Sequence, residues 1–310
     1  HRRYVSALRR AAVRRLRFHD LRHTFGTRMI GRADILRVKE WMGHANVQTT
    51  MRYLHFVPRP DDARLIVPPG FRIDIWADDF EDPRNMALAP NGDVFVVESA
   101  AGRIVLLRDT NGDTLPDMRS IFAYGLNQPF GLAFRGNHLY VGNTDAIVRF
   151  DYTPGQTEAK GEPLRITPLP VGGHSTRNLV FNRDGSKMYV AVGSESNVRD
   201  ETAEPLRAAI TEYNPDGTGR RTFASGLRNP IGLAWKGDAL WTVVNERDGL
   251  GDETPPDYLT SVRDGGFYGW PYSYWGQTVD PRAQPQDPEK VSSAISPDYS
   301  LGSHVAALGL

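Results

Sequence analysis

One unit of sequence recurs four times beyond residue 80 and limits the folds open to this chain. The copies read NMALAPNGDVFVVES from Asn85, GLAFRGNHLYVGN from Gly131, NLVFNRDGSKMYVAVGSE from Asn178 and GLAWKGDALWTVVNE from Gly232. Each copy has a short apolar strand, a polar turn that contains glycine, and a second strand in which apolar residues alternate. The chain is therefore expected to be mainly β.

The spacing of the copies favours one β architecture over the others. The equivalent leucines are Leu88, Leu132, Leu179 and Leu233, which gives spacings of 44, 47 and 54 residues. Hairpin units that recur at roughly 40–50 residues are typical of propeller blades. A β-sandwich has the same local alternation but seldom repeats so regularly. We predict a six-bladed β-propeller, with a β-sandwich as the alternative.

Charge divides the chain into two parts of opposite sign. Residues 1–60 contain 14 Lys and Arg against 3 Asp and Glu, a net charge of +11. The other 250 residues contain 23 basic and 34 acidic groups, a net charge of −11. A polyanion is the expected partner of the first part, and a neutral or cation-assisted ligand that of the second.

Composition excludes several classes of chemistry and leaves the compartment open. The chain has no cysteine, which excludes disulfides, thiolate metal sites and cysteine nucleophiles. No apolar run reaches 18 residues, so we expect no membrane span. No secretory signal is visible, but the chain opens on His1, and we make no prediction of localisation.

The basic part has helical periodicity. Apolar residues recur at three- and four-residue spacing through Leu21, Phe25 and Met29, and again through Ile35, Val38 and Trp41. A basic helical hairpin with a solvated charged face would account for this pattern.

Two strings in this part point to a more specific origin. FHDLRHTFGTRMI and WMGHANVQTTMRYLHF resemble the C-terminal end of a tyrosine recombinase or phage integrase. The resemblance implies that Arg22 clamps a DNA phosphate, that His19 and His44 assist proton transfer, and that Tyr53 is the nucleophile. Tyrosine attack on phosphorus needs cationic donors around the charged transition state.

The resemblance to recombinases covers only about 45 residues. The family's first catalytic arginine and its lysine-bearing hairpin would precede this segment. We therefore expect residues 1–56 to be a short α-helical recombinase fragment that retains possible DNA contacts and does not recombine DNA on its own.

A proline-rich junction separates the two parts. FVPRPDDARLIVPPG, from Phe56 to Gly70, contains four prolines, which deny a helix its backbone donors. We place a linker at residues 57–65 and the propeller at residues 66–310. Six blades need roughly 270–330 residues, so we expect the propeller to be incomplete, truncated at its C-terminal end.

Several motifs of the propeller part point to one family together. VPPGFRIDIWADDFEDPRNMALAPNGDVFVVE, GLNQPFGLAF, GLRNPIGLAW and NERDGLGDETPPDYLTSVRDGGFYGWPYSYWG resemble the soluble glucose/sorbosone dehydrogenases. These are β-propeller enzymes that oxidise sugars with pyrroloquinoline quinone (PQQ) and Ca²⁺. The resemblance covers roughly residues 66–310.

The string GGHSTRNLVF contains the position that supplies the family's catalytic base, here His174. Oxidation of a hydroxyl requires removal of its proton while hydride leaves, and an imidazole titrates in the suitable range. A histidine that only packs within a loop is the alternative. The resemblance implies a quinone or substrate contact for Arg177, with an inter-blade salt bridge as the alternative.

Arg228 and Asn229 lie in GLRNP, and the resemblance implies that they contact the quinone. A cofactor with three carboxylates suits a guanidinium fork, and an asparagine adds amide donors. The equivalent turn GLNQP, from Gly125, forms without the arginine, which favours a function for Arg228.

The loop from Asn245 to Asp257 is dense in carboxylates, which are ligands that Ca²⁺ prefers. We predict Asp248, Asp252 and Asp257 as metal ligands. A solvated acidic loop without an ion is the alternative, because the loop lacks the Gly-Pro that supplies backbone ligands in glucose dehydrogenases. The sorbosone branch of the family has a similarly long acidic loop.

The sequence as a whole therefore predicts a quinone-dependent dehydrogenase of a sugar or sugar-derived aldehyde. DNA recombination through residues 19–53 and a non-catalytic propeller that serves as a binding module are the alternatives.

Overall fold

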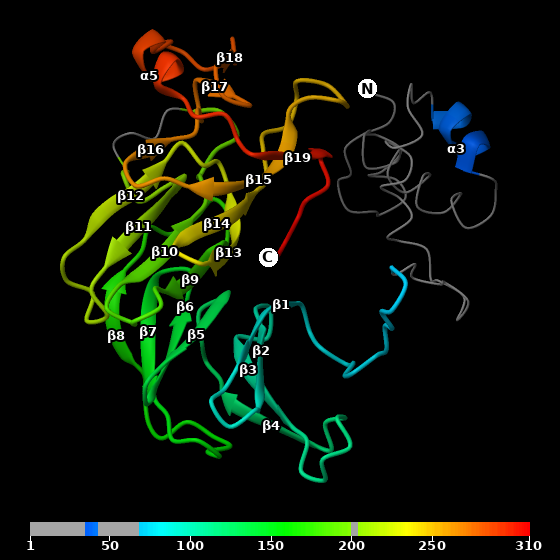
Figure 1. The fold of residues 1–310 in the computed structure, drawn as a ribbon, viewed down its shortest axis with the longest axis vertical. Coiled ribbons are helices and arrows are strands. Elements are labelled where there is room, and N and C mark those ends of the chain that lie inside the picture. The colour runs from blue at the N-terminus through cyan, green and yellow to red at the C-terminus, as the bar shows by residue number, and fades with distance from the viewer. Residues whose placement is uncertain (1–34, 43–67, 200–203) are drawn as a thin grey trace, which may run out of the picture. The chain divides into compact units, whose positions relative to one another are not determined.

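The computed structural model of this chain describes residues 35–42, 68–199 and 204–310. The chain divides into two compact units, His1–Asp74 and Ile75–Leu310. The second unit contains the whole of the repeated sequence, and its ribbon is labelled in Figure 1.

Two short helices are described. Helix α3 (Ile35–Met42) lies in the first unit and buries Val38 and Met42, which are one helical turn apart. The expected helix is thus confirmed here, but Trp41 is 52% exposed and does not belong to the buried face. Helix α5 (Pro288–Ser293) is capped by the Asp287 carboxylate, which accepts from the Lys290 amide. Among the residues that the structure describes, no helix is long and apolar enough to cross a membrane.

Four antiparallel sheets form the second unit, and each contains one copy of the repeat as its first two strands. The strands in sheet order are β1 (Pro83–Leu88), β2 (Val94–Glu98), β3 (Arg103–Arg108) and β4 (Met118–Ala123); β5 (Gly131–Arg135), β6 (His138–Gly142), β7 (Ala146–Asp151) and β8 (Leu164–Pro168); β9 (Arg177–Phe181), β10 (Met188–Val192), β11 (Ala209–Tyr213) and β12 (Arg221–Ser225); β13 (Pro230–Lys236), β14 (Ala239–Val244), β15 (Pro256–Val262) and β19 (Tyr299–Ser303). We number these sheets blades 1 to 4.

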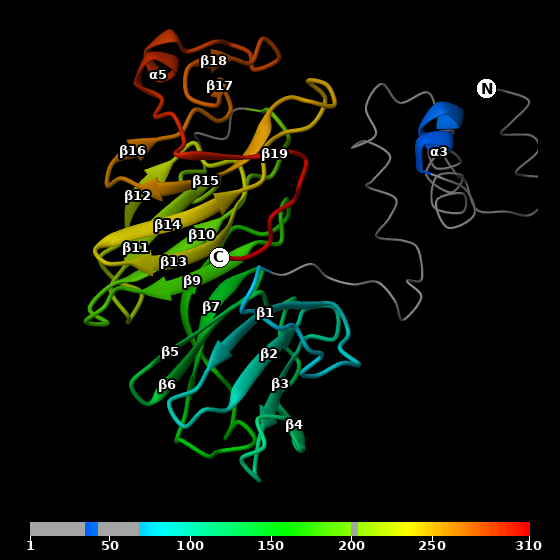
Figure 2. The same cartoon turned by 45° about the vertical axis from the view of Figure 1, so that its right-hand side comes forward.

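The first strands of the blades lie next to one another, as in a propeller (Figures 1 and 2). Asn178 on β9 accepts a hydrogen bond from Asn85 Nδ2 on β1 and donates one to the Ile231 carbonyl on β13. Gly131 on β5 permits a close approach to β9, because a Cβ there would lie 2.7 Å from the Arg177 carbonyl oxygen. The β-propeller class is confirmed and the β-sandwich alternative is wrong. Four blades occur in the described residues, and the count of six stays a prediction.

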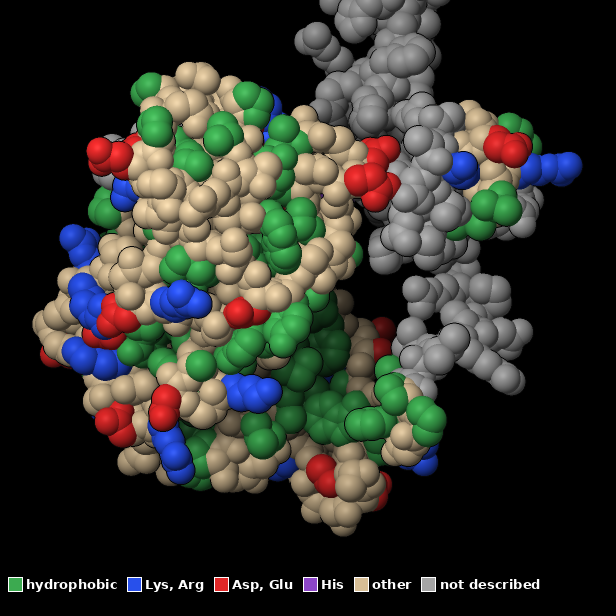
Figure 3. Space-filling model, turned by 45° about the horizontal axis from the view of Figure 1, so that its top comes forward, with side chains coloured by type: hydrophobic (Ala, Val, Ile, Leu, Met, Phe, Trp, Pro, Cys, Tyr) green, Lys and Arg blue, Asp and Glu red, His purple; other side chains and the backbone are tan. Residues whose placement is uncertain are grey.

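Aromatic side chains fill the spaces between neighbouring blades. The ring of Phe95 on β2 meets the rings of Phe122, Phe134 and Tyr152 edge-on at 4.9, 5.1 and 5.6 Å between centroids. Between blades 3 and 4, Tyr189 has the same relation to Trp235, at 5.2 Å. Figure 3 shows further hydrophobic side chains gathered in a hollow of this unit. Contacts of this kind fix how each blade is set against the next.

Blade 3 carries an addition that the other described blades lack. Strand β16 (Gly266–Phe267) pairs in parallel with the edge strand β12, and a small hairpin of β17 (Ser273–Tyr274) and β18 (Thr278–Val279) follows. This segment between β15 and β19 brings the aromatic run of the sequence over the connection from blade 3 to blade 4.

Candidate functional site

Three loops that flank strands of blade 3 meet around His174. The β8–β9 loop presents His174, the end of β10 supplies Gly193 and Ser194, and the β12–β13 turn supplies Arg228 and Asn229. Backbone hydrogen bonds join the loops: the His174 amide donates to the Ser194 carbonyl at 3.0 Å, and the Ser194 amide to the Arg228 carbonyl at 2.8 Å. The structure therefore brings together three of the four residues predicted to bind substrate or quinone.

The geometry of His174 selects its tautomer. Its Nδ1 lies 2.7 Å from the Ser194 carbonyl oxygen and 3.3 Å from the Ser194 hydroxyl oxygen. A carbonyl oxygen can only accept, so Nδ1 carries the proton and Nε2 carries the lone pair. The side chain is half-buried. An imidazole held in this way is suited to accept a proton through Nε2.

Gly193 permits the two sides of the site to approach each other. A Cβ at this position would lie 2.4 Å from Asn229 Oδ1 and 2.6 Å from the Cβ of His174. Any larger residue would separate the histidine from the β12–β13 turn.

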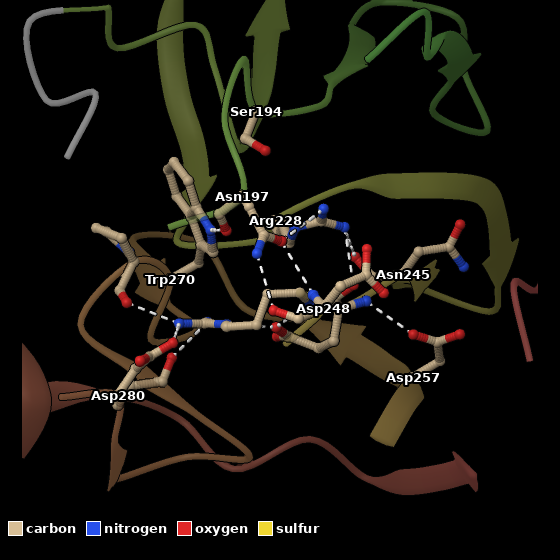
Figure 4. Close-up of polar contacts among 12 residues, drawn as sticks. Ser194, Asn197, Arg228, Asn245, Asp248, Asp257, Trp270 and Asp280 are labelled. Atoms are coloured by element: carbon tan, nitrogen blue, oxygen red, sulfur yellow. Dashed lines mark hydrogen bonds and ion pairs between the residues drawn. The ribbon is translucent and has the colours of Figure 1, made fainter. Parts of the chain in front are cut away.

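Arg228 is buried and only partly satisfied. Its Nη1 donates to the carbonyls of Asn245 and Glu246, and its Nη2 donates to Asn197 Oδ1 at 3.1 Å (Figure 4). Within the described part of the chain, Arg228 Nε and Asn229 Oδ1 are buried without a hydrogen-bond partner. Burial lowers the pKa of Arg228 from its ordinary value, because it penalises the charged form of the guanidinium.

Arg177 is surrounded by backbone carbonyls. Its side chain is fully buried and donates to four carbonyls, those of Thr144, Pro170, His174 and Thr176. Burial, with a smaller contribution from the charge of Arg207, lowers its pKa to about 10. Among the described residues its donors go to carbonyls, and both the quinone contact and the salt bridge stay predictions. Arg177 therefore holds the β8–β9 loop, which carries His174, through hydrogen bonds to its carbonyls.

The three predicted metal ligands do not converge. Asp257 is buried and accepts from the amides of Glu246 and Ala306, while Asp248 is exposed and lies 3.2 Å from Nδ1 of His304. Asp252 is exposed. In residues 35–42, 68–199 and 204–310, no group of three or more His, Cys, Asp or Glu side chains is placed to hold a metal ion. These carboxylates do not fit a shared calcium site.

Asn197 is a central residue that the sequence did not single out. Its Oδ1 accepts from Arg228 and from the Asp248 amide, and its carbonyl accepts from Trp270 Nε1 at 2.9 Å. Its Nδ2 donates to the Asp248 carbonyl. Asn197 thus links blade 3, the β14–β15 loop and the aromatic segment around Trp270 (Figure 4). Arg228 and the acidic loop were singled out from the sequence, but no motif signalled the residue that joins them.

A buried ion network lies beneath the β14–β15 loop and was also missed. Arg247 is fully buried, pairs with Glu246 at 2.9 Å and Asp280 at 3.3 Å, and donates to the carbonyls of Pro271 and Ser273. Arg282 completes the network with two hydrogen bonds to Asp280. The network fixes the backbone at Asn245 and Glu246, whose carbonyls accept hydrogen bonds from Arg228.

The predicted recombinase residues His19, Arg22, His44 and Tyr53 lie outside the described residues.

The fold is that of a β-propeller, and the comparisons with known proteins agree with it. The chain belongs to the TrAA12-like family, whose model matches residues 65–256, and residues 1–58 match the phage integrase family. The resemblances predicted for the two parts of the chain are thereby confirmed.

Solved structures share the fold of the propeller. The holo PQQ domain of pyranose dehydrogenase from Coprinopsis cinerea is 22% identical, with a TM-score of 0.68 over 81% of this chain and 73% of that chain. The calcium structure of a family AA12 protein from Trichoderma reesei is 19% identical, with a TM-score of 0.69 over 79% and 73%.

Curated relatives match each part separately. An uncharacterized Borreliella burgdorferi protein is 24% identical over 261 residues, which cover 79% of this chain and 66% of that protein. Tyrosine recombinase XerC from Pelobacter propionicus is 46% identical over 46 residues, 14% of this chain and 15% of that protein. The chain thus spans less than two thirds of either relative.

Proposed function

We propose that the propeller binds a PQQ-type quinone beside Arg228 and oxidises a sugar or sugar-derived aldehyde, with His174 as the base. The observation that carries this proposal is the 2.7 Å contact of His174 Nδ1 with the Ser194 carbonyl, which leaves Nε2 as the accepting nitrogen. The family, and neighbours described as PQQ-dependent, support the choice of quinone.

The residues present fit an anionic quinone. The buried Arg228 Nε carries an N–H without a partner among the described residues, and such a donor costs about 1–3 kcal/mol unless a ligand accepts from it. A carboxylate is the complementary group, since guanidinium–carboxylate hydrogen bonds are charge-assisted. Asn229 would accept from or orient the same ligand. When bound, the quinone would supply an acceptor for the hydride, which carries both electrons of the oxidation.

The chain's own residues would act on the substrate hydroxyl. His174 Nε2 accepts the hydroxyl proton as the carbon gives up its hydride and the C–O bond becomes a carbonyl. The Ser194 carbonyl then accepts from the Nδ1–H of the imidazolium and stabilises its charge. We assign Arg177 to the support of this loop, because its donors are occupied by carbonyls. We derive no step through calcium, because Asp248, Asp252 and Asp257 do not meet.

Reduction of an artificial dye tests this function. The protein is incubated with PQQ, with and without Ca²⁺, and assayed with glucose and with sorbosone. We expect dye reduction that requires both quinone and sugar. Absence of turnover under all of these conditions would leave the propeller as a binding module.

For the first part of the chain, we propose descent from a tyrosine recombinase with residual DNA contacts. The family match over residues 1–58 favours this. Cleavage of a nicked DNA substrate that is lost in Tyr53→Phe would instead show a working recombinase, and no binding of DNA by the wild-type protein would remove the DNA contact.

A further inference from the structure

We infer that Arg207 is a positioning residue for His174, acting through the carbonyls of the loop that presents the histidine. The inference rests on the proposed function, since it concerns the same imidazole. Arg207 lies just before β11, 33 residues beyond His174, and belongs to no motif of the sequence.

Two buried guanidiniums hold the β8–β9 loop. Arg207 donates from Nη2 to the Val171 carbonyl and from Nη1 to the Gly172 carbonyl at 3.1 Å. Arg177 donates to the carbonyls of Pro170, His174 and Thr176 on the same loop. Five carbonyls of one short loop are therefore fixed by two side chains, and Arg207 alone holds the two residues that lead into Gly173.

Gly173 couples the position of Arg207 to the position of the neighbouring His174. Its φ is +65°, and a Cβ there would lie 2.4 Å from the Glu195 Cα, 2.7 Å from the Ser194 carbonyl oxygen and 3.1 Å from Arg207 Nη1. The loop thus runs in a narrow space between Arg207 and the end of β10. That Ser194 carbonyl is the one that accepts from the amide and Nδ1 of His174.

The surroundings of Arg207 show why no other group would replace it. Its side chain is 2% exposed, and its Nε donates to the Glu204 carboxylate at 2.6 Å. It also lines two cavities, one of about 720 Å³ beside Pro170 and Tyr213, and one of about 290 Å³ beside Trp270. A shorter side chain would open the β8–β9 loop to these cavities. Water would then replace the two N–H donors that hold the Val171 and Gly172 carbonyls.

A displaced loop changes a reaction rate more than it changes binding. Misplacement of a catalytic group by about 1 Å costs on the order of 100-fold in rate. Arg207 touches none of the atoms that would react, so its loss should lower kcat and leave KM for the sugar nearly constant.

The test compares Arg207→Met, Arg207→Lys and Arg207→Ala with the wild-type protein loaded with PQQ. We expect kcat to fall about 10- to 100-fold in Arg207→Met, with a smaller fall in Arg207→Lys and recovery of Arg207→Ala by added guanidinium ion. Arg220→Met is the matched control, because Arg220 lines the larger cavity but is exposed. Its kcat should not change.

A second readout does not depend on turnover. The ¹⁵N chemical shifts of the His174 ring report which nitrogen carries the proton, and we expect Arg207→Met to populate the other tautomer. Unchanged ring shifts and unchanged kcat in a folded Arg207→Met protein would overturn the inference. If that variant does not fold, Gly173→Ala tests the same contact, since its Cβ would push the loop away from Ser194. If the wild-type protein shows no turnover, the proposed function fails, and the ring shifts alone decide the role of Arg207.

Discussion

The β4–β5 turn and the β12–β13 turn have nearly the same sequence and begin with the same backbone conformation, yet only the second belongs to the candidate site. Gly125 and Gly226 begin them with φ of +73° and +70°, and the following leucine amides donate to equivalent carbonyls, those of Gly102 and Ala208. Asn127 in the first turn is exposed, whereas its counterpart Arg228 is 8% exposed. The turn itself therefore does not create the site.

The difference arises from what covers each turn. A Cβ on Gly226 would lie 2.6 Å from the ring of Phe267, whereas a Cβ on Gly125 would have no atom within 4 Å. The segment from β16 to β18 and the loop around Asn197 enclose the second turn. Burial then removes Arg228 from water and makes its unpartnered Nε a strong donor toward an anion. Enclosure, rather than the turn, distinguishes a binding residue from a surface residue.

The largest expected effect comes from disrupting the buried ion network around Arg247 and Asp280, which supports the segments that cover the β12–β13 turn. Asp280→Asn leaves Arg247 buried with one carboxylate instead of two and weakens Arg282. Loss of one member of a buried ion network costs about 3–5 kcal/mol. Urea unfolding of the two proteins measures this difference. The change Asp145→Asn, which breaks an ion pair in which Arg165 is 58% exposed, should cost under about 1 kcal/mol. Equal losses of unfolding free energy in the two variants would show that the buried network of Asp280 stabilises the protein no more than an exposed ion pair does.

The same network predicts a pH dependence. Burial alone would raise the pKa of Asp280, but hydrogen bonds from Arg282 and the charge of Arg247 hold it below 3.8. The folded protein therefore releases this proton more readily than the unfolded chain, and the stabilisation is present above pH 3.8 and lost as pH falls below it. The difference in unfolding free energy between wild type and Asp280→Asn should shrink below pH 4 and stay constant between pH 5 and 7 (about these values). A difference that grows on acidification would contradict the assignment.

The functional contrast between the turns is tested by Arg228→Met and Asn127→Met. Charge-assisted hydrogen bonds contribute about 1.5–3 kcal/mol, so the first change should weaken quinone binding about 10- to 150-fold. Asn127 is exposed, and the second change should leave the affinity within about twofold. Calorimetric titration with PQQ measures both. Similar affinities for the two variants would mean that the quinone does not contact Arg228.

The smallest effect separates backbone conformation from packing. Gly125→Ala and Gly226→Ala both place a Cβ in the left-handed region, which costs about 1–2 kcal/mol. Only Gly226→Ala also meets an aromatic ring, so its thermal unfolding temperature should be lower than that of Gly125→Ala. The reverse order would show that the β16 segment yields easily at this point.

Local sequence predicted the parts of this molecule that depend on local pattern. The recurring leucines gave the blades, and the contrast between GLRNP and GLNQP singled out Arg228, which is buried in a site rather than exposed on a turn. The quinone itself stays a prediction.

Contacts between distant segments were not predictable in the same way. Asn197 meets Arg228 and Trp270 across 31 and 73 residues, and Arg207 meets Gly172 across 35. Such pairs depend on how blades and loops are set against each other, which leaves no periodicity in the sequence. The placement of the carboxylates in the loop from Asn245 to Asp257 could not be predicted for a related reason. Density of carboxylates suggested one metal site, but Asp257 is buried near the start of β15 while Asp248 and Asp252 remain exposed in the preceding loop.

Turnover of His174→Asn in the quinone-saturated protein tests the account most directly. A general base contributes about 10²- to 10⁴-fold to the rate, and the account predicts a loss of that size in dye reduction. The affinity for PQQ should be unchanged, because Arg228 and Asn229 remain in place. A variant that turns over sugar at the wild-type rate with quinone bound would contradict the role of His174 and, with it, the proposed site.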